Sequence, residues 1–145
     1  MQANVVWSQG MAFAADVNGH QVNMDASAPI GKGSAPTPKE LVAIGIAGCT
    51  GMDVAALFKK YKQPVESFEI SVHTEQTSGH PAIFKTVELV YKVTGAVEPE
   101  RFKEAVMLSQ TKYCGVSAMI SAKCPITYKM VLNGETIGEG SALFE

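Results

Sequence analysis

The feature of this sequence that most constrains its fold is a long apolar segment that follows a strong helix-start signal. Thr37, Pro38 and Glu40 have the spacing of a capping box, with a threonine N-cap, a glutamate three residues later and proline at the favoured first helical position. Residues 41–58 then contain a single charge, Asp53. We expect a helix from Pro38 to about Tyr61. Because it is apolar on nearly all sides, it belongs at the centre of a domain or in a subunit interface.

The same segment also has to be tested as a membrane span. A spanning helix needs roughly 20 predominantly apolar residues. The segment 41–58 is shorter, is rich in glycine and alanine, and carries the acid Asp53, which would be costly inside a bilayer. The sequence therefore favours a helix buried in protein, and no membrane partner is expected.

Strand-like alternation is common in the rest of the chain, and it begins with Val5 and Trp7, which alternate with polar neighbours. Two strand-like runs, 11–17 and 20–26, flank Asn18-Gly19, the dipeptide most typical of a tight hairpin. The segments 65–77 and 87–94 alternate apolar and polar residues and predict two long antiparallel strands.

Two more helices and a strand complete the predicted elements. A helix is expected from Pro99 to about Lys112, a short one over 116–122, and a last strand over 126–132. Helices and antiparallel strands are segregated along the chain, which indicates an α+β fold. The length of 145 residues fits a single domain, 1–145.

Charge and cysteine content exclude several classes of protein. Net charge is -2, from 12 Lys+Arg and 14 Asp+Glu, so no basic surplus is available for nucleic acid. The N-terminus lacks the basic and apolar regions of a secretory signal. The three cysteines, an odd number, argue against a disulfide-stapled secreted scaffold and favour the cytoplasm.

The three cysteines differ in their local surroundings. Cys49 lies about three turns into the long helix, where cysteine most often packs as a small hydrophobe, and Asp53 one turn later would raise its pKa. Cys114 lies between two predicted helices, where free backbone N–H groups favour a thiolate, although a buried loop cysteine is an equal alternative. Cys124, before Pro125, has no activating neighbour and is interpreted as structural or as an incidental exposed thiol. Local sequence alone therefore favours Cys114 as the low-pKa thiol.

No metal site or bound cofactor is expected from the residue spacing. The cysteines are scattered without a C-x-x-C pair, and the histidines lack ligand spacing. Motifs for phosphate loops, dinucleotide binding and serine hydrolases are also missing.

Two segments resemble the OsmC/Ohr family. The first runs from Ala35-Pro36-Thr37-Pro38 to Ala47-Gly48-Cys49-Thr50-Gly51-Met52-Asp53-Val54, and the second is Lys112-Tyr113-Cys114-Gly115-Val116-Ser117-Ala118-Met119. The order of elements agrees along essentially the whole chain, and the YhfA-like branch is more similar than typical Ohr proteins. The resemblance implies a two-layer α+β fold with a long central helix, assembled as an intertwined homodimer with its active sites at the subunit interface.

The resemblance also implies a thiol peroxidase that reduces organic hydroperoxides in oxidative-stress defence. Cys49 would be the peroxidatic thiolate and become a sulfenic acid, and Cys114 would resolve it as a disulfide. An external dithiol of the lipoyl type would reduce that disulfide. The family thus reverses the local preference for Cys114.

The sequence departs from the family at the activating arginine. Typical members use an arginine from an N-terminal loop, held by a glutamate directly after the proline of the helix start. Here the residue after the proline is Lys39, and the only arginine is Arg101. Glu40 lies one position later, where its role in the capping box already explains it. Lys32 or Lys39 is a candidate for the positive charge, but Lys39 is ten residues from Cys49, about 15 Å along a straight helix. We therefore expect weaker peroxidase activity than in typical relatives, or a different substrate.

Two other functions compete with a peroxidase. A dimer that kept the fold without efficient turnover could bind a small apolar or thiol-bearing ligand, which the missing arginine favours. A purely structural dimer with inert cysteines is the third possibility.

Overall fold

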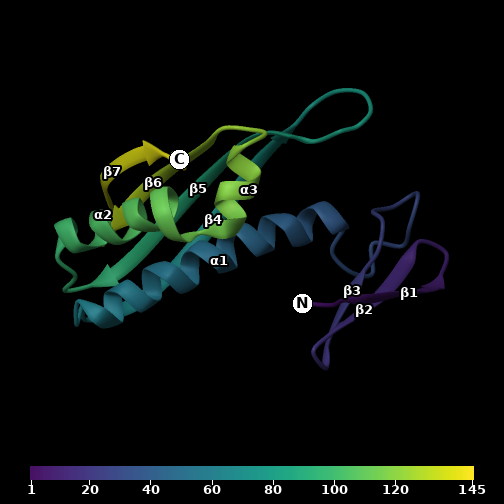
Figure 1. The fold of residues 1–145 in the computed structure, drawn as a ribbon, viewed down its shortest axis with the longest axis horizontal. Helices are drawn as coiled ribbons and strands as arrows, with labels where there is room; N and C mark the ends of the chain where they lie inside the picture. Colours follow the sequence, from purple (N-terminus) through teal and green to yellow (C-terminus); the bar gives the residue numbers. More distant parts are fainter. The chain divides into compact units, whose positions relative to one another are not determined.

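The computed structural model describes residues 1–145 (Figure 1). It divides into two compact units, residues 1–43 and 44–145, and each is described by itself. The prediction that residues 1–145 form one domain stays a prediction.

The first unit contains a three-stranded antiparallel sheet in the order β1-β2-β3, formed by Asn4–Gln9, Ala12–Val17 and His20–Met24. Asn18 and Gly19, at the turn between the last two strands, have φ angles of 54° and 79°. Both lie in the left-handed region that such a two-residue hairpin requires. The predicted hairpin is therefore confirmed.

Helix α1, Pro38–Lys60, begins at the predicted capping box. The Glu40 N–H donates to Thr37 Oγ1 over 3.3 Å, and the Thr37 N–H donates to Glu40 Oε2 over 2.6 Å. The helix ends just before Lys62, whose φ of 53° cannot continue it. Its start is confirmed, and its end is within one residue of the prediction.

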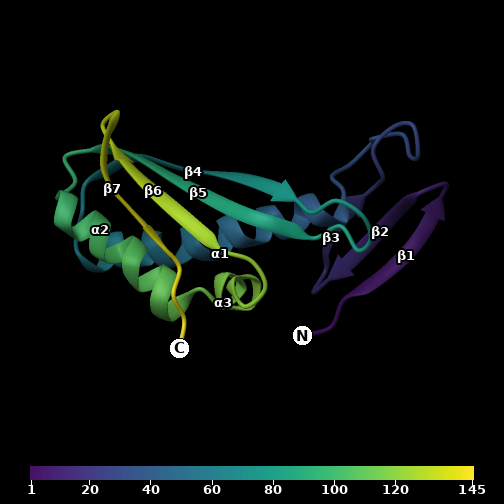
Figure 2. The same cartoon turned by 90° about the horizontal axis from the view of Figure 1, so that it is seen from above.

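The second unit contains a four-stranded sheet in the order β4-β5-β6-β7, seen from a second side in Figure 2. Its strands are Val65–Gln76, Phe84–Gly95, Ile126–Leu132 and Glu135–Ser141. The first pair is antiparallel, as predicted, but β5 and β6 are parallel. The reason is the helical connection between them, because parallel neighbours need a long crossover. The predicted α+β class is confirmed, with a mixed sheet and with one strand, β7, that the sequence analysis did not include.

The crossover consists of α2, Pro99–Leu108, a π-helical turn η1, Ser109–Tyr113, and α3, Gly115–Ser121. A single α-helix was expected to about Lys112. The structure instead widens the last turn, where the Cys114 N–H donates to the Ser109 carbonyl five residues back over 3.0 Å.

The core of the second unit lies between the sheet and the helices α1 and α2. Val87, Leu89, Tyr91 and Val93 of β5 are buried with side chains of both helices, and the rings of Phe58 and Phe102 lie 5.6 Å apart. Helix α1 is long and apolar enough to cross a membrane by length and composition, a test that core helices of globular proteins also pass. Its buried apolar residues Ile46, Val54, Leu57 and Phe58 contribute to this core, but only 28% of its most apolar 18-residue window is buried.

Candidate active site

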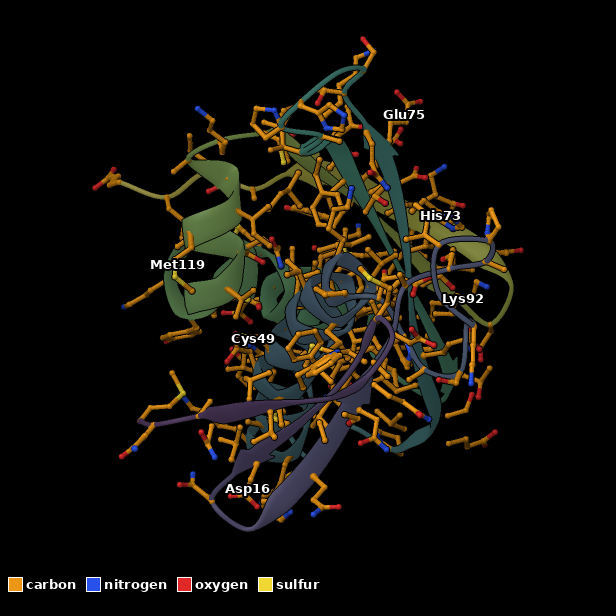
Figure 3. All side chains as sticks on the ribbon, turned by 90° about the vertical axis from the view of Figure 1, so that its right-hand side faces the viewer. Asp16, Cys49, His73, Glu75, Lys92 and Met119 are labelled. Atoms are coloured by element: carbon orange, nitrogen blue, oxygen red, sulfur yellow. The ribbon has the colours of Figure 1, made fainter.

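The fold brings Cys49, Asp53 and Cys114 together. Cys49 and Asp53 are four residues apart on α1 and therefore share one helix face. Cys114 comes from the N-cap of α3. The two sulfur atoms and a carboxylate oxygen of Asp53 all lie within 4.8 Å of one another. Cys49, labelled on its helix in Figure 3, is half-buried, whereas Cys114 is fully buried.

The surroundings of Cys114 include the predicted helix terminus, but they do not lower the pKa of its thiol. As predicted, it precedes a helix, and the Ser117 N–H donates to its sulfur over 3.3 Å. Burial nevertheless raises the pKa of the Cys114 thiol to about 11, with Ser117 lowering the pKa and the neighbouring Cys49 raising it further. The prediction that Cys114 is the low-pKa thiol is wrong, because burial outweighs the helix terminus.

A series of buried hydroxyl groups ends at Asp53. The Ser109 hydroxyl donates to Asp53 Oδ2 over 2.9 Å, so its 2.7 Å bond to Thr50 must be donated by Thr50. The 2.7 Å bond between Thr50 and Tyr91 must then be donated by the Tyr91 hydroxyl. Each hydroxyl proton in this Asp53 network is thus directed toward the carboxylate.

Gln110 completes the Asp53 network. Its side-chain Nε2 donates to both Thr50 Oγ1 and the Tyr91 hydroxyl, over 3.0 Å each. Burial raises the pKa of Tyr91, although its bonds to Thr50 and Gln110 act in the opposite direction. The network therefore joins β5, α1 and η1 beside the two thiols.

The π-helical turn explains how two consecutive residues enter this network. Ser109 and Gln110 are both fully buried, and both reach Thr50 of α1. Neighbours in an ordinary α-helix point about 100° apart, so only one would normally face a given partner. Neither of these residues, nor Thr50, was predicted from the sequence. Thr50 and Asp53 could have been suggested by their positions shortly after Cys49 in the sequence motif.

Cys124 lies outside the Cys49–Asp53–Cys114 cluster. It is 5% exposed, belongs to the apolar core, and has a pKa raised by burial. This supports its interpretation as a structural residue and excludes an exposed thiol in this chain.

The supporting residues predicted from the sequence lie in the first unit. Glu40 is committed to the capping box, where the backbone and hydroxyl of Thr37 lower its pKa. Lys39 is the exposed second residue of α1. Lys32 is exposed in the loop before the helix. The cluster of Cys49, Asp53 and Cys114 lies in the second unit.

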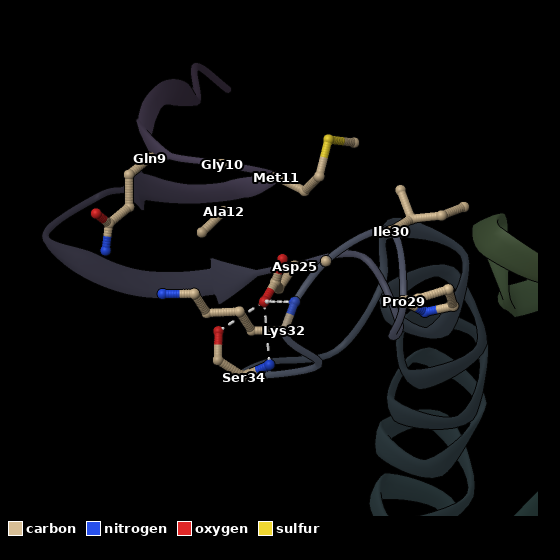
Figure 4. A pocket seen from close by; sticks show the side chains of 10 residues that line it. Gln9, Gly10, Met11, Ala12, Asp25, Pro29, Ile30, Lys32 and Ser34 are labelled. Atoms are coloured by element: carbon tan, nitrogen blue, oxygen red, sulfur yellow. Dashed lines mark hydrogen bonds between the residues drawn. The ribbon is translucent and has the colours of Figure 1, made fainter.

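The loop that carries Lys32 is organised by Asp25. This carboxylate is 3% exposed and accepts hydrogen bonds from the N–H groups of Ala26, Lys32 and Ser34 and from the Ser34 hydroxyl. Bonds from the Ser34 N–H and hydroxyl are the main causes that lower the pKa of Asp25. Figure 4 shows the hydrogen bonds that join Asp25 to Lys32 and Ser34. All three residues line a hollow of about 340 Å³. The sequence analysis gave Asp25 no role.

Comparisons with known proteins identify the family of this chain. Residues 31–129 match the family described as OsmC-like protein, a span that includes Cys49 and Cys114. Protein YhfA of Escherichia coli strain K12 is 33% identical over 130 residues, which cover 88% of this chain and 95% of YhfA.

Two solved structures illustrate the similarity in fold. A hypothetical protein from Aquifex aeolicus has a TM-score of 0.83 and 25% identity over 92% of this chain and 96% of its own. An organic hydroperoxide resistance protein from Elizabethkingia anophelis has a TM-score of 0.67 and 14% identity over 92% of this chain and 94% of its own, which is a likeness of fold. On the family match and the identity to YhfA together, this chain belongs to the OsmC-like protein family.

Proposed function

We propose that this protein is a thiol-dependent peroxidase that reduces organic hydroperoxides and acts in oxidative-stress defence. The observation that carries the proposal is the proximity of Cys49 and Cys114, whose sulfur atoms lie within 4.8 Å although they are 65 residues apart in sequence. Structural neighbours include organic hydroperoxide resistance proteins, which supports a redox function of this class.

The difference in solvent exposure between the two cysteines supports their proposed roles. Cys49 is half-buried and can meet a peroxide, whereas Cys114 is fully buried beneath it. The Cys49 sulfur attacks the distal oxygen of the hydroperoxide, the O–O bond breaks, and the products are an alcohol and a Cys49 sulfenic acid. The Cys114 sulfur then attacks the Cys49 sulfur. A disulfide forms, and the hydroxyl group leaves with the Cys114 proton as water.

The cycle closes by thiol–disulfide exchange with an external dithiol, for which the family resemblance suggests a lipoyl-type reductant. The dithiol is oxidised to its own disulfide while Cys49 and Cys114 return to thiols. No bound cofactor is required. A cytoplasmic location, where thiols are kept reduced, fits this cycle.

The proposed assembly is a homodimer whose two active sites lie at the subunit interface. Only 28% of the most apolar 18-residue window of α1 is buried within one chain. Ile44 and Met52 on this helix are 58% and 75% exposed, and Met119 on α3 is 70% exposed. Single exposed apolar residues are ordinary, but a helix uncovered to this extent favours burial against a second copy. Lys32 or Lys39 is a candidate to supply positive charge in that assembly.

The test is peroxide-dependent loss of thiols. We expect tert-butyl or cumene hydroperoxide to produce a Cys49–Cys114 disulfide, identified by mass spectrometry of a peptide digest. Cys49→Ser should stop peroxide consumption, and Cys124→Ser is the matched control that should retain it. A Cys49→Ser protein that consumes peroxide as fast as the parent contradicts the proposal.

A second candidate function is a small-ligand-binding dimer with little or no turnover. It is favoured by the position of Arg101, which pairs with Glu104 over 2.9 Å and lies 5.0 Å from the centre of the Tyr61 ring. This guanidinium is therefore engaged on α2 rather than placed beside Cys49. Thiols that stay unchanged after long peroxide exposure, together with a ligand that co-purifies, would favour the binding function.

A further inference from the structure

The three atoms of the Cys49–Asp53–Cys114 cluster form a ligand set for a thiophilic divalent metal ion. Two sulfurs and one carboxylate oxygen all lie within 4.8 Å of one another. Around a tetrahedral zinc ion, with metal–sulfur bonds of about 2.3 Å and metal–oxygen bonds of about 2.1 Å, such atoms are roughly 3.5–3.8 Å apart. Closing the cluster by at most about 1.3 Å therefore suffices, and Cys49 is half-buried rather than enclosed by protein.

The groups behind the cluster are those that metal ligands commonly use as outer partners. The Ser109 hydroxyl donates to Asp53 Oδ2, and Thr50 and Tyr91 hold Ser109 in turn. Carboxylate ligands are typically oriented by such hydrogen bonds, and their loss weakens metal affinity. This carboxylate is therefore held in place by a network that is independent of the thiols.

The sulfur of Cys114 also has donors arranged around it. The Ser117 N–H points at this sulfur over 3.3 Å. The Ser117 hydroxyl, on the residue whose N–H contacts this sulfur, is fully buried and has no hydrogen-bond partner. An unpartnered buried hydroxyl is costly unless some state of the site uses it. A metal-bound thiolate at Cys114 would accept that hydrogen bond.

We propose that, in the reduced protein, Cys49, Asp53 and Cys114 bind one Zn²⁺-class ion per chain. The ion takes two thiolate sulfurs and one carboxylate oxygen, and its fourth position stays open to water or a ligand. Both thiols lose their protons on binding, so two protons are released per ion. Because the same sulfurs form the proposed disulfide, metal binding and the disulfide exclude each other.

The test uses the reduced, full-length protein and zinc alone, without peroxide. We expect calorimetry to show one ion bound per chain. Cobalt in place of zinc should give the intense sulfur-to-cobalt absorption and visible bands of a tetrahedral thiolate site. Protein oxidised beforehand to the Cys49–Cys114 disulfide with diamide should bind neither metal.

Matched variants separate this site from accidental binding. Cys49→Ser and Cys114→Ser should each lose the cobalt–thiolate absorption in large part and weaken zinc binding, whereas Cys124→Ser should bind like the parent. Asp53→Asn should weaken zinc binding, whereas Asp16→Asn, which changes an exposed acid in the first unit, should not. Ser109→Ala should cost about 10- to 100-fold in affinity through the orientation of Asp53. Circular dichroism confirms that each variant is folded.

The proposal is overturned if the reduced parent binds no zinc, or if Cys49→Ser and Cys114→Ser bind it as tightly as the parent. Unchanged affinity in a folded Asp53→Asn protein overturns the three-ligand site. These results are independent of the peroxidase, because zinc binding without peroxide consumption rejects only the proposed function. Peroxide consumption without zinc binding rejects only the metal site.

Discussion

Asp25 and Asp53 are two acids in the same chain whose surroundings differ in one decisive respect. Asp25 accepts four hydrogen bonds from its own loop and is almost inaccessible. Asp53 accepts one hydroxyl bond from Ser109 and lies half-buried beside two thiols. A carboxylate that accepts several hydrogen bonds from backbone N–H groups stabilises a loop. A carboxylate that accepts a single hydrogen bond and stays partly exposed can take part in chemistry. The following predictions test that difference.

The largest expected effect concerns turnover at Cys114. In Cys114→Ser, the Cys49 sulfenic acid has no resolving thiol. When the lipoyl-type dithiol is limiting, we therefore expect each chain to consume about one peroxide and peroxide consumption then to stop abruptly. Dimedone labelling followed by mass spectrometry should locate the sulfenic acid at Cys49. Disulfide-coupled turnover at the rate of the parent would show that Cys114 is not the resolving residue.

A large loss of stability is expected from the centre of the Asp53 network. Thr50→Val keeps the shape of the side chain but removes the hydroxyl that joins Tyr91, Gln110 and Ser109. Because buried partners lose their hydrogen bonds, we expect unfolding to require about 1–3 kcal/mol less free energy. Urea denaturation measures this loss. As a control, Thr111→Val changes an exposed hydroxyl of the same π-helical turn and should have little effect.

The pH dependence of the loop should follow Asp25. Its pKa in the folded protein lies below the ordinary value of 3.8, so its contribution to stability is complete above that value and is lost as pH falls through the lower, folded pKa. Asp25→Asn should remove this dependence and loosen residues 26–34. Amide hydrogen exchange by NMR at a series of acidic pH values measures it. Asp16→Asn, in the neighbouring hairpin, is the matched control, and equal loosening in that variant would contradict the assignment.

The smallest expected effect lies at the start of α1. Thr37→Ala removes the N-cap oxygen that accepts from the Glu40 N–H, and we expect a loss of about 1 kcal/mol in unfolding free energy. Peroxide consumption per folded chain should not change, since this cap lies outside the thiol cluster. A parallel loss of activity in fully folded protein would indicate that the start of the helix contributes to the site.

Local rules predicted much of this fold. Asn18-Gly19 specifies its hairpin by positive φ angles, and the capping box specifies the start of α1, because both signals act within a few residues. The parallel pairing of β5 and β6 was not predictable in the same way. Alternation identifies a strand but not the neighbour beside which a long connection places it.

The site was predictable only in part. Cys49 and Asp53 share a helix face by their spacing, but the approach of Cys114 depends on the crossover, and the family motifs supplied that pairing. The direction of the Cys114 pKa shift was missed because burial is a property of the packed chain. Ser109 and Gln110 were not predicted, because no local sequence pattern indicated a π-helical turn.

The π-helical turn determines which side chains after α2 face the buried Thr50. It accommodates one residue more than an α-helical turn would, and each helical residue rotates the chain by about 100°. We expect deletion of the exposed Thr111 to return this turn to α-helical geometry, in which neighbouring side chains lie about 100° apart, so that Ser109 and Gln110 no longer both reach Thr50. One extra residue in a helical turn thus lets two consecutive polar side chains meet the same buried threonine.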